Sequence, residues 1–155
     1  MAHHTMTVPK REELSRLNRE WTQLFSTGDV DRVDQLLAPD FVDHNPAPGS
    51  TPDRQGVKDW LRSTKQAFSN LKATSEDEII EGDKIVVRSR LTGKHTGPYQ
   101  GMPPSNKEFS IETIDIVRVR DGKGVEHWGV FDALGMLQQL GFVEAPGAPA
   151  MAGKR

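Results

Sequence analysis

The first half of the chain spaces its apolar residues as helices do. Three stretches show this pattern: 11–26, a short one from 29 to 38 that ends before Pro39, and one that follows Asp53 as its N-cap. Each predicts an amphipathic helix that buries one face. The inward positions are Leu14, Leu17, Trp21, Leu24 and Phe25, then Val30, Val33, Leu36 and Leu37, then Val57, Trp60, Leu61, Thr64 and Phe68.

From Leu71 onward the pattern changes to alternation of apolar and polar residues. Residues 71–81, 84–95, 107–120 and 123–131 read as four strands, with glycine-containing hairpin turns at 81–83 and 121–123. A short helix follows Asp132 and ends near Gly141. Helices first and an antiparallel meander second predict an α+β fold, with the N-terminal helices on the concave face of a curved antiparallel sheet. One domain is expected, over residues 10–142.

Strand alternation assigns residues to the two faces of this sheet. His95, Asp115 and His127 fall on the mostly apolar face that the helices would cover. Polar groups buried there need partners, and such surroundings shift the pKa values of carboxylates and imidazoles. The outer face would carry an apolar patch, which predicts a homodimer. Its members are Ile114, Ile116, Trp128 and Val130.

Composition narrows the classes of function. The chain has 155 residues, a net charge of -2 and no cysteine, so nothing in its charge favours nucleic acid or an anionic membrane, and disulfides are excluded. No apolar run reaches the ~20 residues of a spanning helix. Residues 1–9 read as a tag remnant with a disordered start, and 143–155 as a mobile tail rich in Ala, Pro and Gly. The absence of an export signal favours a cytoplasmic protein.

Four groups of residues occur together in an order that resembles a known family. They are Phe41-Val42-Asp43-His44-Asn45-Pro46, Lys94-His95-Thr96-Gly97 with Gly101-Met102-Pro103-Pro104, the run 115–123, and Glu126-His127-Trp128 followed by Asp132 and Leu137-Gln138-Gln139-Leu140-Gly141. The chain resembles the SnoaL-like polyketide cyclase (ester cyclase) group of the nuclear-transport-factor-2-like superfamily over roughly residues 10–142. The resemblance implies a cone-shaped α+β barrel with a deep pocket for a small apolar molecule, a dimer, and no metal or organic cofactor.

The same resemblance implies roles for two aspartates. Asp132, just before the last helix, matches the general acid/base of an intramolecular aldol closure. An apolar pocket mouth would keep its pKa near neutrality, whereas helix amides would lower it, so a simple N-cap is the alternative. Asp115 is similar in place to the oxyanion-hole aspartate of ketosteroid isomerases and is a candidate substrate contact. The hairpin should bring it beside His127, and the alternative is a buried ion pair that only orders the core.

Other candidates carry an alternative of their own. His127 and His95 are predicted to line the pocket and act with Asp132, unless each is a buried histidine that only satisfies a hydrogen bond. His44 and Asn45 are predicted at a polar rim, although turn formation before Pro46 also explains them. The remaining predicted substrate contacts, which could equally be core residues, are Trp21, Phe25, Trp60, Tyr99 and Phe131.

Two functions follow from these residues. In the first, the protein is a cofactor-independent cyclase or isomerase that performs acid–base chemistry on a small apolar carbonyl compound, and Asp132 moves the proton. In the second, the same domain binds a small ligand or a partner without turnover. The position of Asp132 separates them, because the enzyme needs its carboxylate open to the cavity and near an imidazole, whereas a binding domain tolerates a carboxylate turned toward its own helix.

Overall fold

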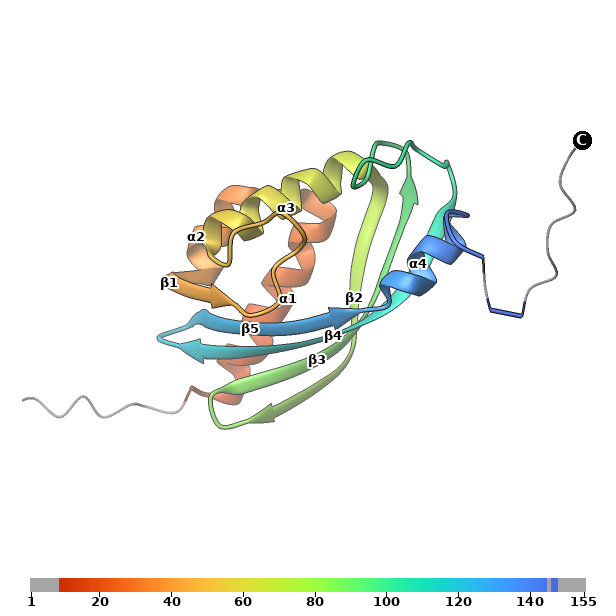
Figure 1. Ribbon diagram of the computed structural model, residues 1–155. Helices are drawn as coiled ribbons and strands as arrows, with labels where there is room; N and C mark the ends of the chain where they lie inside the picture. The colour runs from red at the N-terminus through yellow and green to blue at the C-terminus, as the bar shows by residue number, and fades with distance from the viewer. Residues whose placement is uncertain (1–8, 145, 148–155) are drawn as a thin grey trace, which may run out of the picture.

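Three helical segments lie against the concave face of a strongly curved sheet, and a fourth helix follows the last strand (Figure 1). The computed structural model describes residues 9–144, 146 and 147; most of the predicted tag remnant and of the predicted mobile tail lies outside these residues. The elements are α1 (Arg11–Thr27), a 3-10 turn η1 (Val30–Arg32), α2 (Val33–Leu36), β1 (Leu37–Asp43), α3 (Arg54–Ala67), β2 (Phe68–Glu81), β3 (Lys84–His95), β4 (Glu108–Arg120), β5 (Lys123–Phe131) and α4 (Ala133–Gln139). The predicted α+β class is confirmed.

The sheet is mixed rather than wholly antiparallel. Its order is β1-β5-β4-β3-β2, and strands β2 to β5 form the predicted antiparallel meander. Strand β1 adds to the free edge of β5 in parallel, with Asp43 opposite His127. Local alternation cannot reveal this pairing, because the two strands are far apart in the chain. The described strands do not close into the barrel that the resemblance implies, since β1 and β2 form the two edges of the sheet.

Local sequence explains how these elements begin and end. At the β4–β5 turn Asp121 and Gly122 both have positive φ, 51° and 75°, as the tight turns that match the strand twist require. Helix α1 ends at Gly28, whose φ of 67° lets its N–H bond the Leu24 carbonyl at 2.8 Å. Helix α3 begins at Asp53, whose carboxylate accepts the Gly56 N–H at 3.0 Å, so the predicted cap is confirmed.

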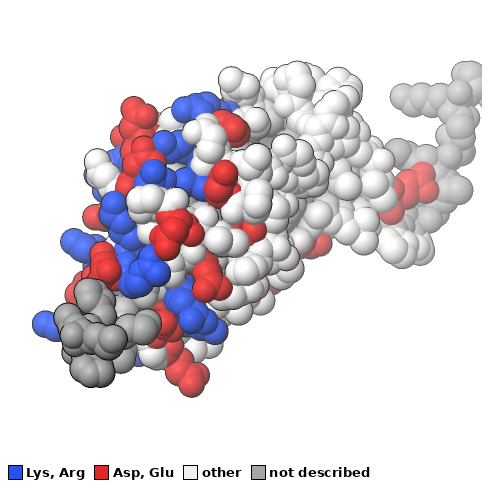
Figure 2. Space-filling model, turned by 60° about the vertical axis from the view of Figure 1, so that its left-hand side comes forward, with Lys and Arg blue, Asp and Glu red and all other residues white. Residues whose placement is uncertain are grey.

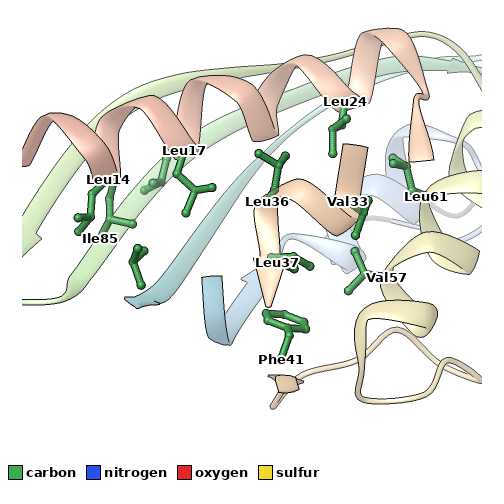
Figure 3. Packing of buried hydrophobic residues seen from close by; sticks show 12 residues of the cluster. Leu14, Leu17, Leu24, Val33, Leu36, Leu37, Phe41, Val57, Leu61 and Ile85 are labelled. Carbon is green, nitrogen blue, oxygen red and sulfur yellow. The ribbon is translucent and has the colours of Figure 1, made fainter. Parts of the chain in front are cut away.

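Two apolar clusters join the helices to the sheet. In the first, Leu14 and Leu17 of α1 point toward Ile85 of β3, while Leu24 lies near Val33 (Figure 3). The second cluster packs Phe68 of β2 and Phe109 of β4 against Met136 of α4. Members of both clusters line one cavity on the concave side of the sheet. The helices therefore shape the pocket rather than fill the whole concave face.

The surface carries both signs of charge. Figure 2 shows lysine and arginine side chains interspersed with aspartate and glutamate on the side of the molecule that lies at the left in Figure 1. Examples on the sheet are Arg88 and Arg90, which both bond Glu76 and Glu112.

None of the helices in the described residues is both long enough and apolar enough to cross a lipid bilayer.

Candidate active site

A cavity of about 220 Å³ lies between the helices and the concave face of the sheet. Its walls come from α1, α3, β1 and the inner faces of β3, β4 and β5. Eight residues that the sequence singled out line it: Trp21, Phe25, Asn45, Trp60, Tyr99, Asp115, His127 and Phe131. The predicted pocket is thus present, and its wall is mainly apolar with a few polar groups, as small-molecule sites usually are.

Aromatic side chains form one part of the wall. Phe25 meets Trp21 edge-on at 6.2 Å between ring centroids and Trp60 at 5.7 Å. Tyr99 packs against Phe68 at 5.1 Å, and burial raises the pKa of its phenol. Tyr99 therefore stays a neutral group at ordinary pH. This part of the cavity suits the flat apolar body of a ligand.

The polar part of the cavity is centred on His127 of β5. Its Nδ1 lies 2.9 Å from Asp43 Oδ1, and its Nε2 lies 2.8 Å from Asp115 Oδ1. The pairing of Asp115 with His127 was predicted and is confirmed. The carboxylates come from β1 and β4, the strands on either side of β5, so the sheet itself assembles the cluster Asp43–His127–Asp115.

The two carboxylates make His127 a cation. Burial lowers the pKa of the imidazole, but the hydrogen bonds and negative charges of Asp115 and Asp43 outweigh this and raise it to about 9. Burial also works against ionised Asp43, yet the bond and charge of His127 hold the pKa of that carboxyl below its usual value. At neutral pH an imidazolium therefore lies between two carboxylates and donates a proton to each.

Asp115 is the more exposed of the two carboxylates, both of which line the cavity. Its side chain is 36% exposed, against 13% for Asp43. Its second oxygen, Oδ2, accepts the hydroxyl of Thr113 at 3.0 Å, so both oxygens are held while the group still faces the cavity. Asn45 lies beside this centre, because its Oδ1 accepts the Gly129 N–H at 3.1 Å.

Asp132 does not lie where the catalytic prediction needs it. Its carboxylate accepts the Gly135 N–H at 2.9 Å and caps α4. The side chain is exposed, is not part of the cavity wall, and has no hydrogen bond to an imidazole among the described residues. The predicted opening of Asp132 to the cavity beside His127 or His95 is therefore wrong. Cap geometry explains this, because a carboxylate bonded to the N–H three residues on is folded back over its own helix.

His95 also lies off the cavity. Its ring is fully buried and packs between Phe68 and Phe142. Its Nδ1 accepts a hydrogen bond from the Ser105 N–H at 3.1 Å. Burial lowers the pKa of this imidazole, and a backbone hydrogen bond with Gly97 raises it by a smaller amount. The ring is therefore neutral at neutral pH. The alternative of a buried structural histidine describes His95, and its predicted place in the pocket is wrong because β3 runs past the cavity before it reaches this residue.

His44 faces the outer side of the sheet. Its ring stacks on Trp128 at 4.7 Å and 7°, and its Nε2 lies 3.1 Å from Glu126. Alternation along β1 explains this, because Phe41 and Asp43 point inward and His44 therefore points outward. The prediction of His44 at the pocket rim is wrong, whereas Asn45, predicted at the same rim, lines the cavity. The same alternation, applied to 41–45, would have identified Asp43, which sequence reasoning missed.

Metal-binding geometry is not found in the part of the chain that the structure describes. Within residues 9–144, 146 and 147 no three His, Cys, Asp or Glu side chains are arranged to hold a metal ion. In Asp43–His127–Asp115 the central ring donates both of its protons to the carboxylates. The imidazolium and the two carboxylates of this cluster are groups that can transfer protons and compensate charge.

Sequence comparison places this site in a known context. Residues 15–140 match the family model described as SnoaL-like polyketide cyclase. The chain is 36% identical to the nogalonic acid methyl ester cyclase of Streptomyces nogalater, over 76% of this chain and 89% of that one. It is 33% identical to the aklanonic acid methyl ester cyclase DnrD of Streptomyces peucetius, over 81% of this chain and 88% of that one.

Solved structures agree with these matches. TsrD from Streptomyces laurentii superposes with a TM-score of 0.81 at 30% identity, covering 87% of this chain and 99% of that one. IdmH from Streptomyces antibioticus superposes with a TM-score of 0.73 at 32% identity, covering 82% of this chain and 97% of that one. The fold, the family model and the curated relatives agree, and the chain belongs to the SnoaL-like polyketide cyclase family.

Proposed function

We propose that this protein closes a ring by an intramolecular aldol reaction on a small ester that carries several carbonyl groups. Two curated relatives are named as cyclases of nogalonic and aklanonic acid methyl esters, and a substrate of that kind fits an apolar cavity with polar groups in one part. One observation carries the proposal: the Asp115 carboxylate faces the cavity, and its Oδ1 lies 2.8 Å from His127 Nε2. The orientation of Asp132 toward its own helix would, taken alone, favour the binding domain. Asp115 instead supplies what the enzyme needs, a carboxylate in the cavity wall beside an imidazole.

Asp115 acts as the base and then as the acid. Its carboxylate removes a proton from a carbon between two carbonyl groups, whose oxygens share the resulting negative charge. The enolate carbon then bonds to the carbon of a further carbonyl group in the same molecule, distinct from the two beside it. The oxygen of that further carbonyl group becomes an alkoxide. Asp115 returns its proton to the alkoxide, so protons and electrons balance within one substrate molecule. The overall reaction needs no external oxidant or reductant.

His127 and Asp43 support this exchange without touching the reacting carbon. The imidazolium donates to Asp115 and places a positive charge beside the developing enolate, which a preorganised site exploits. Asp43 accepts from the other ring nitrogen and fixes the plane of the ring. The aromatic wall around Trp21, Phe25 and Trp60 holds the body of the substrate.

The variant Asp115→Asn tests the base. Asparagine keeps the size of the side chain but cannot take a proton, so kcat on either methyl ester should fall by about 100- to 10,000-fold while ligand affinity changes little. Asp132→Asn is the matched control, because it makes the same chemical change at the α4 cap and should leave turnover near that of the wild type. An Asp115→Asn enzyme with wild-type turnover would exclude the role of Asp115. Tight ligand binding without any turnover by the wild type would favour the binding domain instead.

We also propose a homodimer through the outer face of the sheet. Ile114 and Val130, opposite one another on β4 and β5, are 46% and 67% exposed. Ile116 joins the row because it pairs with Trp128 on β5 and with Val86 on β3. A continuous apolar surface of this kind usually marks a protein contact.

A cytoplasmic location stays a prediction of the sequence.

Light scattering at micromolar concentration tests the dimer. The wild type should have the mass of two chains, and Trp128→Glu should have the mass of one, because it places a charge in the proposed contact. Arg16→Glu, on the exposed side of α1, should stay dimeric. A monomeric wild type, or a dimer unaffected by Trp128→Glu, would contradict the proposal.

A further inference from the structure

Gly129 occupies the position on β5 directly opposite Asp115. It lies between His127 and Phe131 in the inward-facing set and is part of the cavity wall. A Cβ added to Gly129 would lie 2.6 Å from His127 Nε2, and within 3.0 Å of Asp115 Oδ1 as well. Both separations are shorter than real side chains adopt. The Asp115 carboxylate and the His127 ring that it bonds therefore occupy the space that any other residue at position 129 would fill.

Backbone conformation does not explain this glycine. Gly129 is absent from the residues with positive φ, so its backbone is open to other amino acids. Its N–H donates to Asn45 Oδ1, which every residue except proline could do. Glycine inside a strand gives up packing and conformational entropy, and it often marks a close approach of another group. Here the approaching groups are the Asp115 carboxylate and the His127 ring.

We infer that Gly129 is a positioning residue for the base: its missing side chain lets Asp115 lean across from β4 and bond His127. The register supports this geometry, because Asp115 pairs with Gly129 while His127 lies two residues earlier, opposite Val117. A contact from Asp115 to His127 must therefore run diagonally over Cα of residue 129. The functional part of this inference rests on the proposed role of Asp115, whereas the geometric part does not.

The variant Gly129→Ala tests the inference in the full-length protein. Its methyl group would separate Asp115 from His127, so the pKa of His127 should fall from about 9 by one pH unit or more in an NMR titration of labelled histidine. Displacement of the base by about 1 Å should lower kcat by about 100-fold, with a smaller change in KM. The histidine resonance that is missing from the spectrum of His127→Gln identifies the signal of His127.

Gly124→Ala is the matched control on the same strand. A Cβ there would crowd the ends of Leu37 and Val117 at 3.0 and 3.2 Å, so it burdens the packing of β5 without touching the charged pair. It should leave the His127 titration and kcat close to those of the wild type. An unchanged His127 titration in Gly129→Ala, or an equal loss in Gly124→Ala, would overturn the inference.

A double-mutant cycle removes the dependence on a single variant. Asp115→Ala removes one of the two groups that a Cβ at residue 129 would meet and leaves the His127 ring free to shift toward the vacated side. Adding Gly129→Ala should therefore lower the denaturation midpoint less in that background than in the wild type. If Gly129→Ala alone does not fold, recovery of folding in the double variant supports the steric conflict. Equal shifts in both backgrounds, or a double variant that fails to fold although Asp115→Ala folds, would refute it. None of these readouts needs turnover, so they stay informative if Asp115 proves not to be the base.

Discussion

The charge of His127 should make the stability of the fold depend on pH in a defined window. The two carboxylates raise the pKa of this imidazole to about 9, whereas in the unfolded chain it should be near 6.5. A raised histidine pKa stabilises the folded state fully below the unfolded pKa, and this stabilisation is lost as pH rises through the folded pKa. Stability attributable to His127 should thus fall between about pH 6.5 and 9.

The expected size follows from the two pKa values. A pKa raised from 6.5 to about 9 corresponds to roughly 3 kcal/mol, at 1.36 kcal/mol per pH unit. The His127 side chain is 25% exposed, and solvent weakens its interaction with the two carboxylates. We therefore expect the free energy of unfolding to fall by at least about 2 kcal/mol across this window. In comparison, the whole free energy of unfolding of a domain is about 5–15 kcal/mol.

Chemical denaturation of the wild type and His127→Gln at one protein concentration measures the effect. The free energy of unfolding should fall from pH 7 to pH 9 in the wild type and stay nearly level in the variant. The window avoids two other groups: burial lowers the pKa of His95, which costs stability only at lower pH, and raises that of Tyr99, which acts only at higher pH. Parallel curves for the two proteins from pH 7 to 9 would refute the imidazolium between two carboxylates.

Two further predictions concern the helix caps. Asp132→Asn should change the free energy of unfolding by only a few tenths of a kcal/mol, because asparagine caps α4 as well as aspartate does; thermal denaturation measures this, and a loss above about 1 kcal/mol would show that the carboxylate does more than cap. Asp53→Ala should cost about 1 kcal/mol, since it removes the bond to the Gly56 N–H. Asp53→Asn is its control, and equal losses in both variants would contradict the cap.

The fold was largely predictable because its elements follow local patterns. Alternation gave the bounds of β3 and β5 as they are found, and the glycine-containing turns joined the strands of the meander correctly. It also placed Asp115 and His127 on one face, from which their contact follows. The parallel partner of β5 was not predictable, because nothing in residues 37–43 specifies a strand that comes so much later.

The errors at the site have physical causes that local patterns do not contain. Alternation tells which face His95 occupies but not how far along β3 the cavity extends. Asp132 has an apolar neighbour on each side, which suggested a pocket mouth, yet the cap bond turns its carboxylate away from the cavity. His44 was assigned by its chemistry rather than by alternation along β1. Asp43 was overlooked for the same reason.

The parallel pairing of β1 with β5 has a consequence for the order in which the molecule can fold. Asp43 and His127 are 84 positions apart, so closing this contact costs chain entropy that short hairpins avoid. During synthesis β1 emerges early and has no strand to pair with until residues 123–131 have been made. Sequence separation therefore favours a folding order in which the meander forms first from neighbouring segments and β1 is added last. The Asp43–His127 contact needs both β1 and β5, so a protein truncated before β5 lacks His127 and cannot assemble the site.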